Sequence, residues 1–253
     1  MATGMARGAR ARGKAIAFGD GRRIIWDQNS EIVFRGNPNI APPGSEGRAA
    51  NIEWVPYYKG HRIYNYHDRT KDRWVWNMEF RPTPGEMFFT DEEAERGRRY
   101  GNGFVLIEPA VERWKVSAQN KDWGRVRYQT VADRLLRAGY GVMQFSYSRM
   151  PLPGVRQLAA ADFRDALAIA SQASLYIGPE GGLHHGAAAV GLPAVVLFGG
   201  FIPPQVTGYD THTNLTGGAE ACGSLKPCAH CRAAMNAISV EEVVSAAIER
   251  MPA

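Results

Sequence analysis

The sequence predicts an α/β fold that is built on a parallel sheet. Three observations in the second half of the chain support this prediction. Short apolar runs alternate with longer helical segments, some of these segments begin with a residue that caps helices, and polar loops follow the apolar runs. Apolar strands that alternate with helices are typical of a parallel sheet with both faces covered.

The predicted elements follow one another from residue 104 onwards. Strands are expected at 104–108, 140–146, 174–178 and 194–198, and helices at 125–137, 162–172 and 182–190. Asp162 is expected to cap its helix. Ser239 begins a capping box, Ser-Val-Glu-Glu, and with it a last helix that runs to about Met251. Ligands bind at the carboxyl ends of the strands in open α/β sheets. One site is therefore predicted from the loops 117–121, 180–185 and 199–208.

The segment 174–199 gives the clearest indication of a ligand. Its turn, Gly-Pro-Glu-Gly-Gly, opens a helix, so that bare backbone N–H groups and the positive end of the helix dipole meet at one point. Such a point suits a phosphate or a diphosphate. Gly181 and Gly182 allow the backbone to approach an anion closely. His184 and His185 follow in the first turn, where a side-chain donor can reach the same anion.

The same stretch resembles the donor-binding motif of the ADP-heptose:lipopolysaccharide heptosyltransferase family, glycosyltransferase family 9. Gly181 stands where the family has Ser or Thr, so one hydroxyl contact to the donor is lost. The resemblance covers mainly residues 103–250. It implies a GT-B-like fold, with a C-terminal Rossmann-like parallel sheet domain and a shortened N-terminal α/β domain. The matching positions are Glu180, Gly182, His185, Pro193 and Gly199.

Two further blocks fit the resemblance. Lys121 and Trp123 match the family's Lys-x-Trp, whose lysine contacts the donor phosphates, and Ser117 aligns with a family hydroxyl. Thr207 and Gly208 match a family loop that lies close to the donor. A lysine where a strand passes into a helix also suits a diphosphate on physical grounds. The alternative for Lys121 is a solvated surface lysine.

The N-terminal third contains the candidate catalytic base. The expected strand at 14–19 ends in Gly-Asp-Gly, and the resemblance places Asp20 at the family's candidate base. The alternative is a hairpin turn, since Asp-Gly is a strong turn signal, with flanking strands at 24–26 and 31–34. The expected division is a disordered basic arm at 1–13, a reduced acceptor-side domain at 14–100 and a nucleotide-sugar-binding domain at 101–253.

The composition does not decide whether the chain binds nucleic acid or anionic lipid. The formal net charge is +5, and much of the excess lies in the first 23 residues. A basic arm of this kind can touch nucleic acid or anionic lipid, or it can be a solubilising tail. Neither an export signal nor a run of about 18 apolar residues is present, so a cytoplasmic protein without a transmembrane segment is expected.

All three cysteines lie close together near the end of the chain. Cys222, Cys228 and Cys231 with His230 suggest a metal site, but the second Cys-x2-Cys pair of a usual zinc site is missing. His212 could supply a fourth ligand only by folding back. Free thiols or a disulfide are the alternative, and a reduced state is expected in a cytosolic protein.

Taken with the resemblance, these features predict a glycosyltransferase that uses a nucleotide-sugar donor, ADP-heptose by family default, and a glycan or other hydroxyl acceptor. The transfer is expected to invert the anomeric centre, with Asp20 as base. Lys121, the start of the helix at Gly182 and His185 would hold the leaving diphosphate. No cofactor or metal is expected to be required, since no Asp-x-Asp cluster occurs. A transferase acting on modified nucleic acid and a non-catalytic nucleotide-sugar-binding protein are the alternatives.

Overall fold

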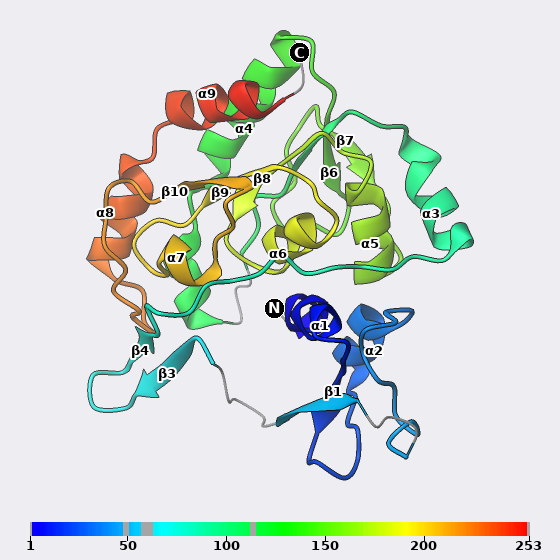
Figure 1. Cartoon of the computed structure of the whole chain (residues 1–253). Helices are drawn as coiled ribbons and strands as arrows, with labels where there is room; N and C mark the ends of the chain where they lie inside the picture. Colours follow the sequence, from blue (N-terminus) through cyan, green and yellow to red (C-terminus); the bar gives the residue numbers. More distant parts are fainter. Residues whose placement is uncertain (1, 48–50, 57–62, 112–114, 252–253) are drawn as a thin grey trace.

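The computed structural model describes residues 2–47, 51–56, 63–111 and 115–251. Its main sheet has six parallel strands in the order β10-β9-β8-β5-β6-β7 (Figure 1). The predicted α/β fold with a parallel sheet is therefore confirmed. The strands are β5 Val105–Ile107, β6 Val142–Phe145, β7 Arg156–Leu158, β8 Leu175–Pro179, β9 Ala194–Leu197 and β10 His212–Leu215.

The two edge strands, β7 and β10, were not predicted. Their sequences are Arg-Gln-Leu and His-Thr-Asn-Leu, which lack the apolar runs of the central strands. In β7 the first two side chains are exposed and only Leu158 is buried. An edge strand is covered on fewer sides than a central one, so its sequence carries a weaker apolar signal.

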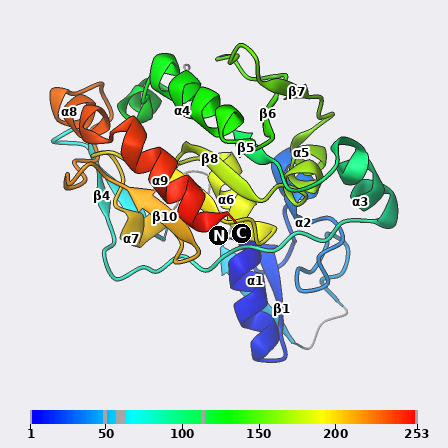
Figure 2. The same ribbon diagram turned by 90° about the horizontal axis from the view of Figure 1, so that it is seen from above.

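Helices cover both faces of this sheet (Figure 1). α4 Arg125–Arg137 and α9 Val240–Arg250 lie side by side on one face, and Figure 2 shows them from above. α5 Phe163–Ala170 and α6 Gly182–Ala189 cover the other face. The expected caps are confirmed: Asp162 accepts the N–H of Asp165, and Ser239 accepts the N–H of Glu242.

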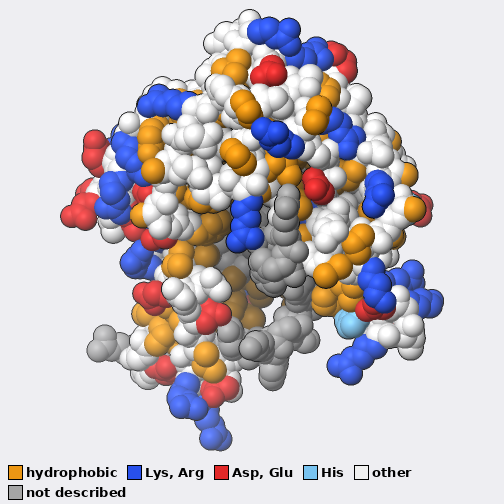
Figure 3. All heavy atoms as spheres, turned by 180° about the vertical axis from the view of Figure 1, so that it is seen from behind, with side chains coloured by type: hydrophobic (Ala, Val, Ile, Leu, Met, Phe, Trp, Pro, Cys, Tyr) orange, Lys and Arg blue, Asp and Glu red, His pale blue; other side chains and the backbone are white. Residues whose placement is uncertain are grey.

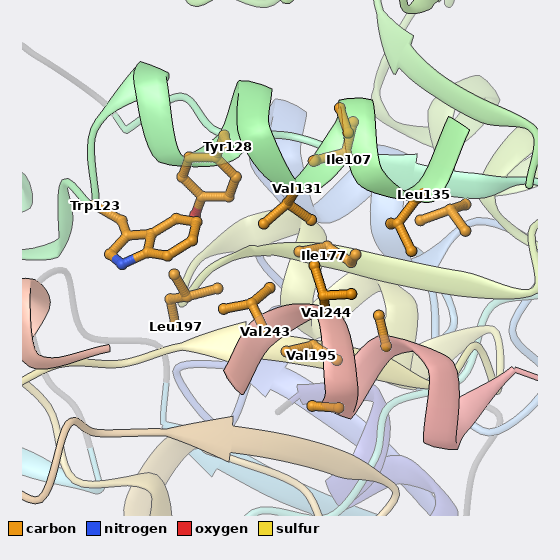
Figure 4. Packing of buried hydrophobic residues seen from close by; sticks show 14 of the residues in the cluster. Ile107, Trp123, Tyr128, Val131, Leu135, Ile177, Val195, Leu197, Val243 and Val244 are labelled. Atoms are coloured by element: carbon orange, nitrogen blue, oxygen red, sulfur yellow. The ribbon is translucent and has the colours of Figure 1, made fainter. Parts of the chain in front are cut away.

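The core beneath α4 and α9 fixes the first loop of the predicted site. Trp123 is fully buried, donates from Nε1 to the carbonyl of Ile238 over 2.9 Å, and packs edge-on against Tyr128. Figure 4 shows these two rings beside the apolar residues of α4, α9 and the sheet. The short helix η2 Val116–Lys121 ends two residues before Trp123, so this anchor holds Lys121 near the sheet.

The first residues form a helix, so the prediction of a disordered arm at 1–13 is wrong for the part that the structure describes. α1 Ala2–Ala11 buries Ala6 and Ala9 against Ile16 and Phe34. Composition suggested a polar tail, but alanine favours helix, and the tertiary contacts on one face stabilise it. Arg7 of α1 pairs with Glu86, and Arg12, directly after the helix, pairs with Glu53.

The N-terminal unit is small. After α1 it contains β1 Ala15–Gly19, α2 Gln28–Phe34 and β2 Ile52–Pro56, and β1 and β2 pair in parallel as a two-stranded sheet. The flanking strand predicted at 31–34 is wrong, since these residues belong to α2, which Asp27 caps through the N–H of Ser30. The aromatic and basic segment after β2 includes 57–62, which lies outside the described residues.

The β3–β4 hairpin and α3 pack against the C-terminal unit, although the sequence placed residues 14–100 in the N-terminal domain. The hairpin of β3 Asn65–Asp68 and β4 Arg73–Trp76 joins it through the Trp74 N–H, which donates to Gly223 over 2.8 Å. α3 Asp91–Gly97, with the 3-10 turn η1 Arg98–Tyr100, packs on α5. Between these elements, Gly85 and Glu86 bind the side chain of Arg7 in α1, so the segment 65–100 contacts both units.

The remaining helices, α7 Pro204–Thr207 and α8 Ala229–Ala237, lie near the β10 edge of the sheet (Figure 1). In the described part of the chain, no helix has the length and apolar character needed to cross a membrane. On the face shown in Figure 3, Lys and Arg side chains are scattered among Asp and Glu and do not form one continuous basic patch.

Candidate donor-binding site

A cavity of about 530 Å³ lies where β5, β6 and β8 end, at the edge of the sheet where the sequence predicted a site. Four predicted donor-binding residues line it: Lys121, Glu180, Gly181 and Gly182. Glu108, after β5, and Ser148, after β6, line the same cavity and were not predicted. A second cavity of about 440 Å³ beside η2 is lined by none of the predicted donor-binding residues.

Lys121 and Glu180 form an ion pair in this cavity. The ammonium of Lys121 donates to Glu180 Oε2 over 2.7 Å and to the Glu180 carbonyl over 2.8 Å. Burial opposes ionisation of Glu180, but the Lys121 charge, aided by His185, outweighs it and holds the pKa of this carboxyl well below its usual value. The solvated alternative for Lys121 is wrong, since only 14% of its side chain is exposed.

His185 supports the same carboxylate. Its Nε2 lies 3.6 Å from Glu180 Oε1, and its Nδ1 is 2.9 Å from the hydroxyl of Tyr209. His184, in contrast, is fully buried, and burial, with the charge of His185 next, lowers its pKa well below the usual value. The expected contact of His184 with an anion is therefore not possible in this arrangement, whereas His185 is partly exposed beside Glu180.

The start of α6 provides backbone donors. No side chain caps this helix at Gly181, and the first intrahelical bond is donated by His185 to the Gly181 carbonyl. The N–H groups of the first turn therefore have no partner inside the helix. Among the described residues, a Cβ on Gly181 would meet nothing within 4 Å, so glycine here leaves open space in front of the helix. Gly186 lies one turn further on, where a Cβ would fall 2.2 Å from Leu167 Cδ2, and this close contact fixes α6 against α5.

Glu108 is the residue of this site that the sequence analysis missed. It directly follows β5 and is only 5% exposed. Burial raises its pKa to about 7, against the smaller effects of hydrogen bonds from Ser148 and the Ala110 N–H. Its sequence signal was weak, because a glutamate after a short apolar strand is also typical of an ordinary surface loop.

The other predicted donor-binding residues lie outside the cavity lining. Ser117 is in η2, one residue before Ala118, which does line it. Thr207 is buried at the end of α7, and a Cβ on Gly208 would collide with the Pro204 carbonyl, so both positions serve the packing of this turn. The turn reaches the site through the next residue, Tyr209, which contacts His185.

The structure does not bring Asp20 to the cavity. Its Oδ1 accepts the N–H groups of Arg22 and Arg23, which lowers its pKa, and Gly19 pairs with Ile24 across the turn. The turn alternative therefore describes this segment. In Figure 1 the loop after β1 lies on the side of the N-terminal unit that faces away from the main sheet. Asp20 directly follows a strand, as predicted, but the end of this strand points away from the cavity.

The three cysteines form a cluster outside the cavity. Their Sγ atoms lie within 4.8 Å of one another, and all three are free thiols. This set provides three sulfur ligands for a metal. His212 packs against His184 and Tyr209, so it is not the fourth ligand, and the His230 ring bonds to the Glu220 carbonyl. Glu180, His184 and His185 also bring three ligand atoms within 4.8 Å, but the Lys121 ammonium already occupies that carboxylate.

Two solved structures with similar folds are described as glycosyltransferases. The dodecameric iron-containing glycosyltransferase TibC from enterotoxigenic E. coli is 16% identical, with 88% of this chain and 68% of TibC covered and a TM-score of 0.59. A family 9 glycosyl transferase from Veillonella parvula is 14% identical, with 97% and 76% covered and a TM-score of 0.52. At these identities the likeness concerns the fold, and it confirms the predicted GT-B-like architecture.

ADP-heptose LPS heptosyltransferase II from E. coli is 17% identical, with 70% of this chain covered and a TM-score of 0.46. This chain spans 54% of the length of that enzyme. No curated protein matched the sequence. The family model for glycosyltransferase family 9 (heptosyltransferase), however, matches residues 75–238, more than half of the chain. The chain therefore belongs to glycosyltransferase family 9, the heptosyltransferase family.

Proposed function

We propose that this chain is a glycosyltransferase that binds the diphosphate of a nucleotide-sugar donor in the cavity at the carboxyl edge of the main sheet. One observation carries the proposal: the Lys121 ammonium and the uncapped start of α6 at Gly182 line the same cavity. A lysine beside a helix N-terminus is a favourable environment for a diphosphate.

The ion pair leaves Lys121 able to take part. An ammonium group has three N–H donors, and two of them are directed at Glu180. The third is available to a phosphate oxygen. During transfer the leaving nucleotide diphosphate gains negative charge, and fixed positive groups lower the barrier by stabilising that charge. Lys121 and the backbone N–H groups of α6 would therefore favour bond cleavage as well as binding.

The sugar would be placed near Glu180. Its carboxylate is kept ionised, so it accepts hydrogen bonds from sugar or ribose hydroxyls. TibC is described in a complex with ADP-D-β-D-heptose, which makes an ADP-heptose-like donor the first candidate for this chain. We propose a hydroxyl group as acceptor and inversion at the anomeric carbon.

The proposed transfer does not require a metal ion. The sequence has no Asp-x-Asp cluster, and Lys121 with the start of α6 supplies the positive charge that a metal would otherwise provide. Transfer or donor hydrolysis is expected to be equal with and without a chelator. Activity that is lost with chelator and restored by Mg²⁺ or Mn²⁺ would show that a metal is needed.

A second candidate is donor binding without transfer. In the described part of the N-terminal unit, the sheet that contains β1 has two strands, and Asp20 is held in a turn away from the cavity. Such a protein would bind the donor but lack a base for the acceptor. The two candidates differ in one measurable quantity, the release of nucleotide diphosphate in the presence of acceptor.

The decisive experiment is calorimetric binding of ADP and ADP-heptose, followed by a turnover assay. Wild type is compared with the double variant Lys121→Met/Glu180→Gln, which removes both charges of the pair and leaves neither unpaired. Binding to wild type that is lost in the double variant, at unchanged thermal stability, would support the site. No binding of either nucleotide to wild type would refute the proposed function.

A further inference from the structure

Glu108 lines the cavity, but the proposed function gives it no role. It lies at the end of β5, between the Glu180 loop after β8 and the Ser148 loop after β6, because β5 pairs with both of those strands. Neighbouring strands are about 5 Å apart, so Glu108 lies one strand away from the proposed diphosphate site. A carboxyl group that is 5% exposed at this position is costly unless it has a partner.

The hydrogen bonds around Glu108 determine which of its oxygens can carry a proton. The Met150 N–H donates to Ser148 Oγ over 3.2 Å, so the Ser148 hydroxyl directs its own hydrogen to Glu108 Oε1, 2.5 Å away. The Ala110 N–H donates to the same oxygen over 3.0 Å. Oε1 therefore accepts two hydrogen bonds. Oε2 is buried and has no partner among the described residues. A proton on Glu108 belongs on Oε2.

The surroundings of Glu108 favour its neutral form. Burial raises its pKa to about 7, so about half of the molecules carry this proton at neutral pH. Tyr128 and Tyr176 are buried, whereas Tyr147 is about half exposed. Desolvation raises the pKa of all three hydroxyls, and the charge of an ionised Glu108 raises them further. The charged residues that line the same cavity are Lys115, Lys121, Arg149 and Glu180. Of these, Lys121 and Glu180 already neutralise each other.

We propose that Glu108 binds the donor as a neutral carboxylic acid: a small turn of the carboxyl group brings the buried Oε2 to the cavity surface, where its O–H donates to an anionic oxygen of the diphosphate. This inference rests on the proposed function. An ionised carboxylate beside a diphosphate would be repelled in a cavity of low dielectric constant, whereas the neutral acid forms a charge-assisted O–H···O⁻ hydrogen bond. A buried carboxyl group that stays neutral at pH 7 can act as such a donor.

The inference predicts that the protein binds the donor more weakly as the pH rises. The diphosphate binds the protonated form, so its negative charge raises the pKa of Glu108 further and binding takes up a proton above pH 7. The apparent affinity falls with the protonated fraction. If only the neutral form binds, the affinity of wild type falls about 30-fold between about pH 6 and 8.5 from this group alone.

The test is calorimetric titration of ADP into wild type and Glu108→Gln between about pH 6 and 8.5. Gln is neutral at every pH and keeps the shape of the acid. Any pH dependence of the variant's affinity therefore comes from the titration of ADP itself. The ratio of the affinities of variant and wild type then gives the effect of Glu108 alone. The expected ratio is close to one at pH 6 and about 30 in favour of the variant at pH 8.5. Titration in two buffers of different ionisation enthalpy should show uptake of up to one proton by wild type at pH 8.5, and less by the variant.

Ser148→Ala is the second variant. It removes a hydrogen bond that stabilises the ionised form, so the pKa of Glu108 rises and ADP binding persists to higher pH than in wild type. A purely structural role of Glu108 would not produce this shift. An affinity ratio that is constant with pH, while wild type binds ADP, would overturn the inference and leave the proposed function intact. Absence of ADP binding to wild type and both variants at every pH would overturn both.

Discussion

The ammonium of Lys121 donates to the carboxylate of Glu180 over 2.7 Å, although the two residues are 59 positions apart in the chain. Each residue was identified in the sequence separately, as a ligand of the donor. In the folded protein they are first of all partners of each other. The pair keeps a lysine and a carboxylate charged inside a cavity, at the end of β8 and beside the start of α6, before any donor binds.

Lys121→Met is expected to destabilise the fold and to abolish donor binding. Glu180 is 95% buried, and removing its partner leaves a buried charge without compensation, at a cost of about 3 kcal/mol in the free energy of unfolding. Urea unfolding measures this cost, and ADP titration measures the binding. Glu180→Gln in the same chain should recover most of the stability and none of the binding. Recovery of binding in the double variant would contradict the role of Lys121.

Local signals in the sequence were sufficient for the four central strands of the main sheet and for the helices that cover its faces. The predicted helix at 125–137 has the observed bounds, and Asp162 and Ser239 cap their helices as expected. These features depend on residues within one or two turns. α1 was missed because it depends on tertiary contacts, the burial of Ala6 and Ala9 against β1 and α2.

The candidate site was predicted in its centre and missed at its margins. A motif fixes the order of residues, so Glu180, Gly181 and Gly182 appear together at one loop. It does not fix which neighbouring strand end meets that loop. Glu108 enters the site only because β5 lies between β8 and β6 and because Ser148, 40 residues later, contacts it. That relationship exists only in three dimensions.

Asp20→Asn is expected to leave turnover within about twofold of wild type. The carboxylate of Asp20 is held by two backbone N–H groups of its own turn and does not line the cavity. A catalytic base contributes about 10²-fold or more to the rate. Steady-state kinetics with a saturating donor therefore separates the two cases. A loss of 10²-fold in kcat with unchanged donor affinity would restore Asp20 as the base.

Cys228 is expected to react first with iodoacetamide at neutral pH. Burial opposes ionisation of this thiol, but hydrogen bonds from the Cys231 N–H at the start of α8 and from the neighbouring thiols together outweigh it, so the pKa of Cys228 is lowered. Burial raises the pKa of Cys231, which is fully inaccessible. Peptide mapping by mass spectrometry measures the order of alkylation, and Cys228→Ser should remove the fast phase. Equal rates at Cys228 and Cys231 would contradict this order. Protection by added Zn²⁺ would show that the cluster holds a metal.

Glu93→Gln is expected to lower the free energy of unfolding by about 3 kcal/mol, because it leaves the guanidinium of Arg164 buried and without its charge partner. Arg164 is 2% exposed and donates to both oxygens of Glu93, over 2.7 and 2.8 Å. It also donates to the carbonyls of Ile32 and Arg35, so the pair joins α3 and α5 to α2. Urea unfolding at pH 7 measures the loss. Glu92→Gln, at the exposed neighbouring position, is the matched control and should change stability by less than about 0.5 kcal/mol.

The same pair predicts a pH dependence of stability. Hydrogen bonds from Arg164 lower the pKa of Glu93 to about 2, from a usual value of 4.5. A carboxyl group with a lowered pKa in the folded state stabilises the fold fully above its unfolded pKa, and this contribution is lost as the pH falls through the folded value. Wild type should therefore lose stability between pH 4.5 and about 2 more steeply than Glu93→Gln, and the two curves should converge at the acidic end. Parallel curves over this range would show that Glu93 is not held ionised by Arg164.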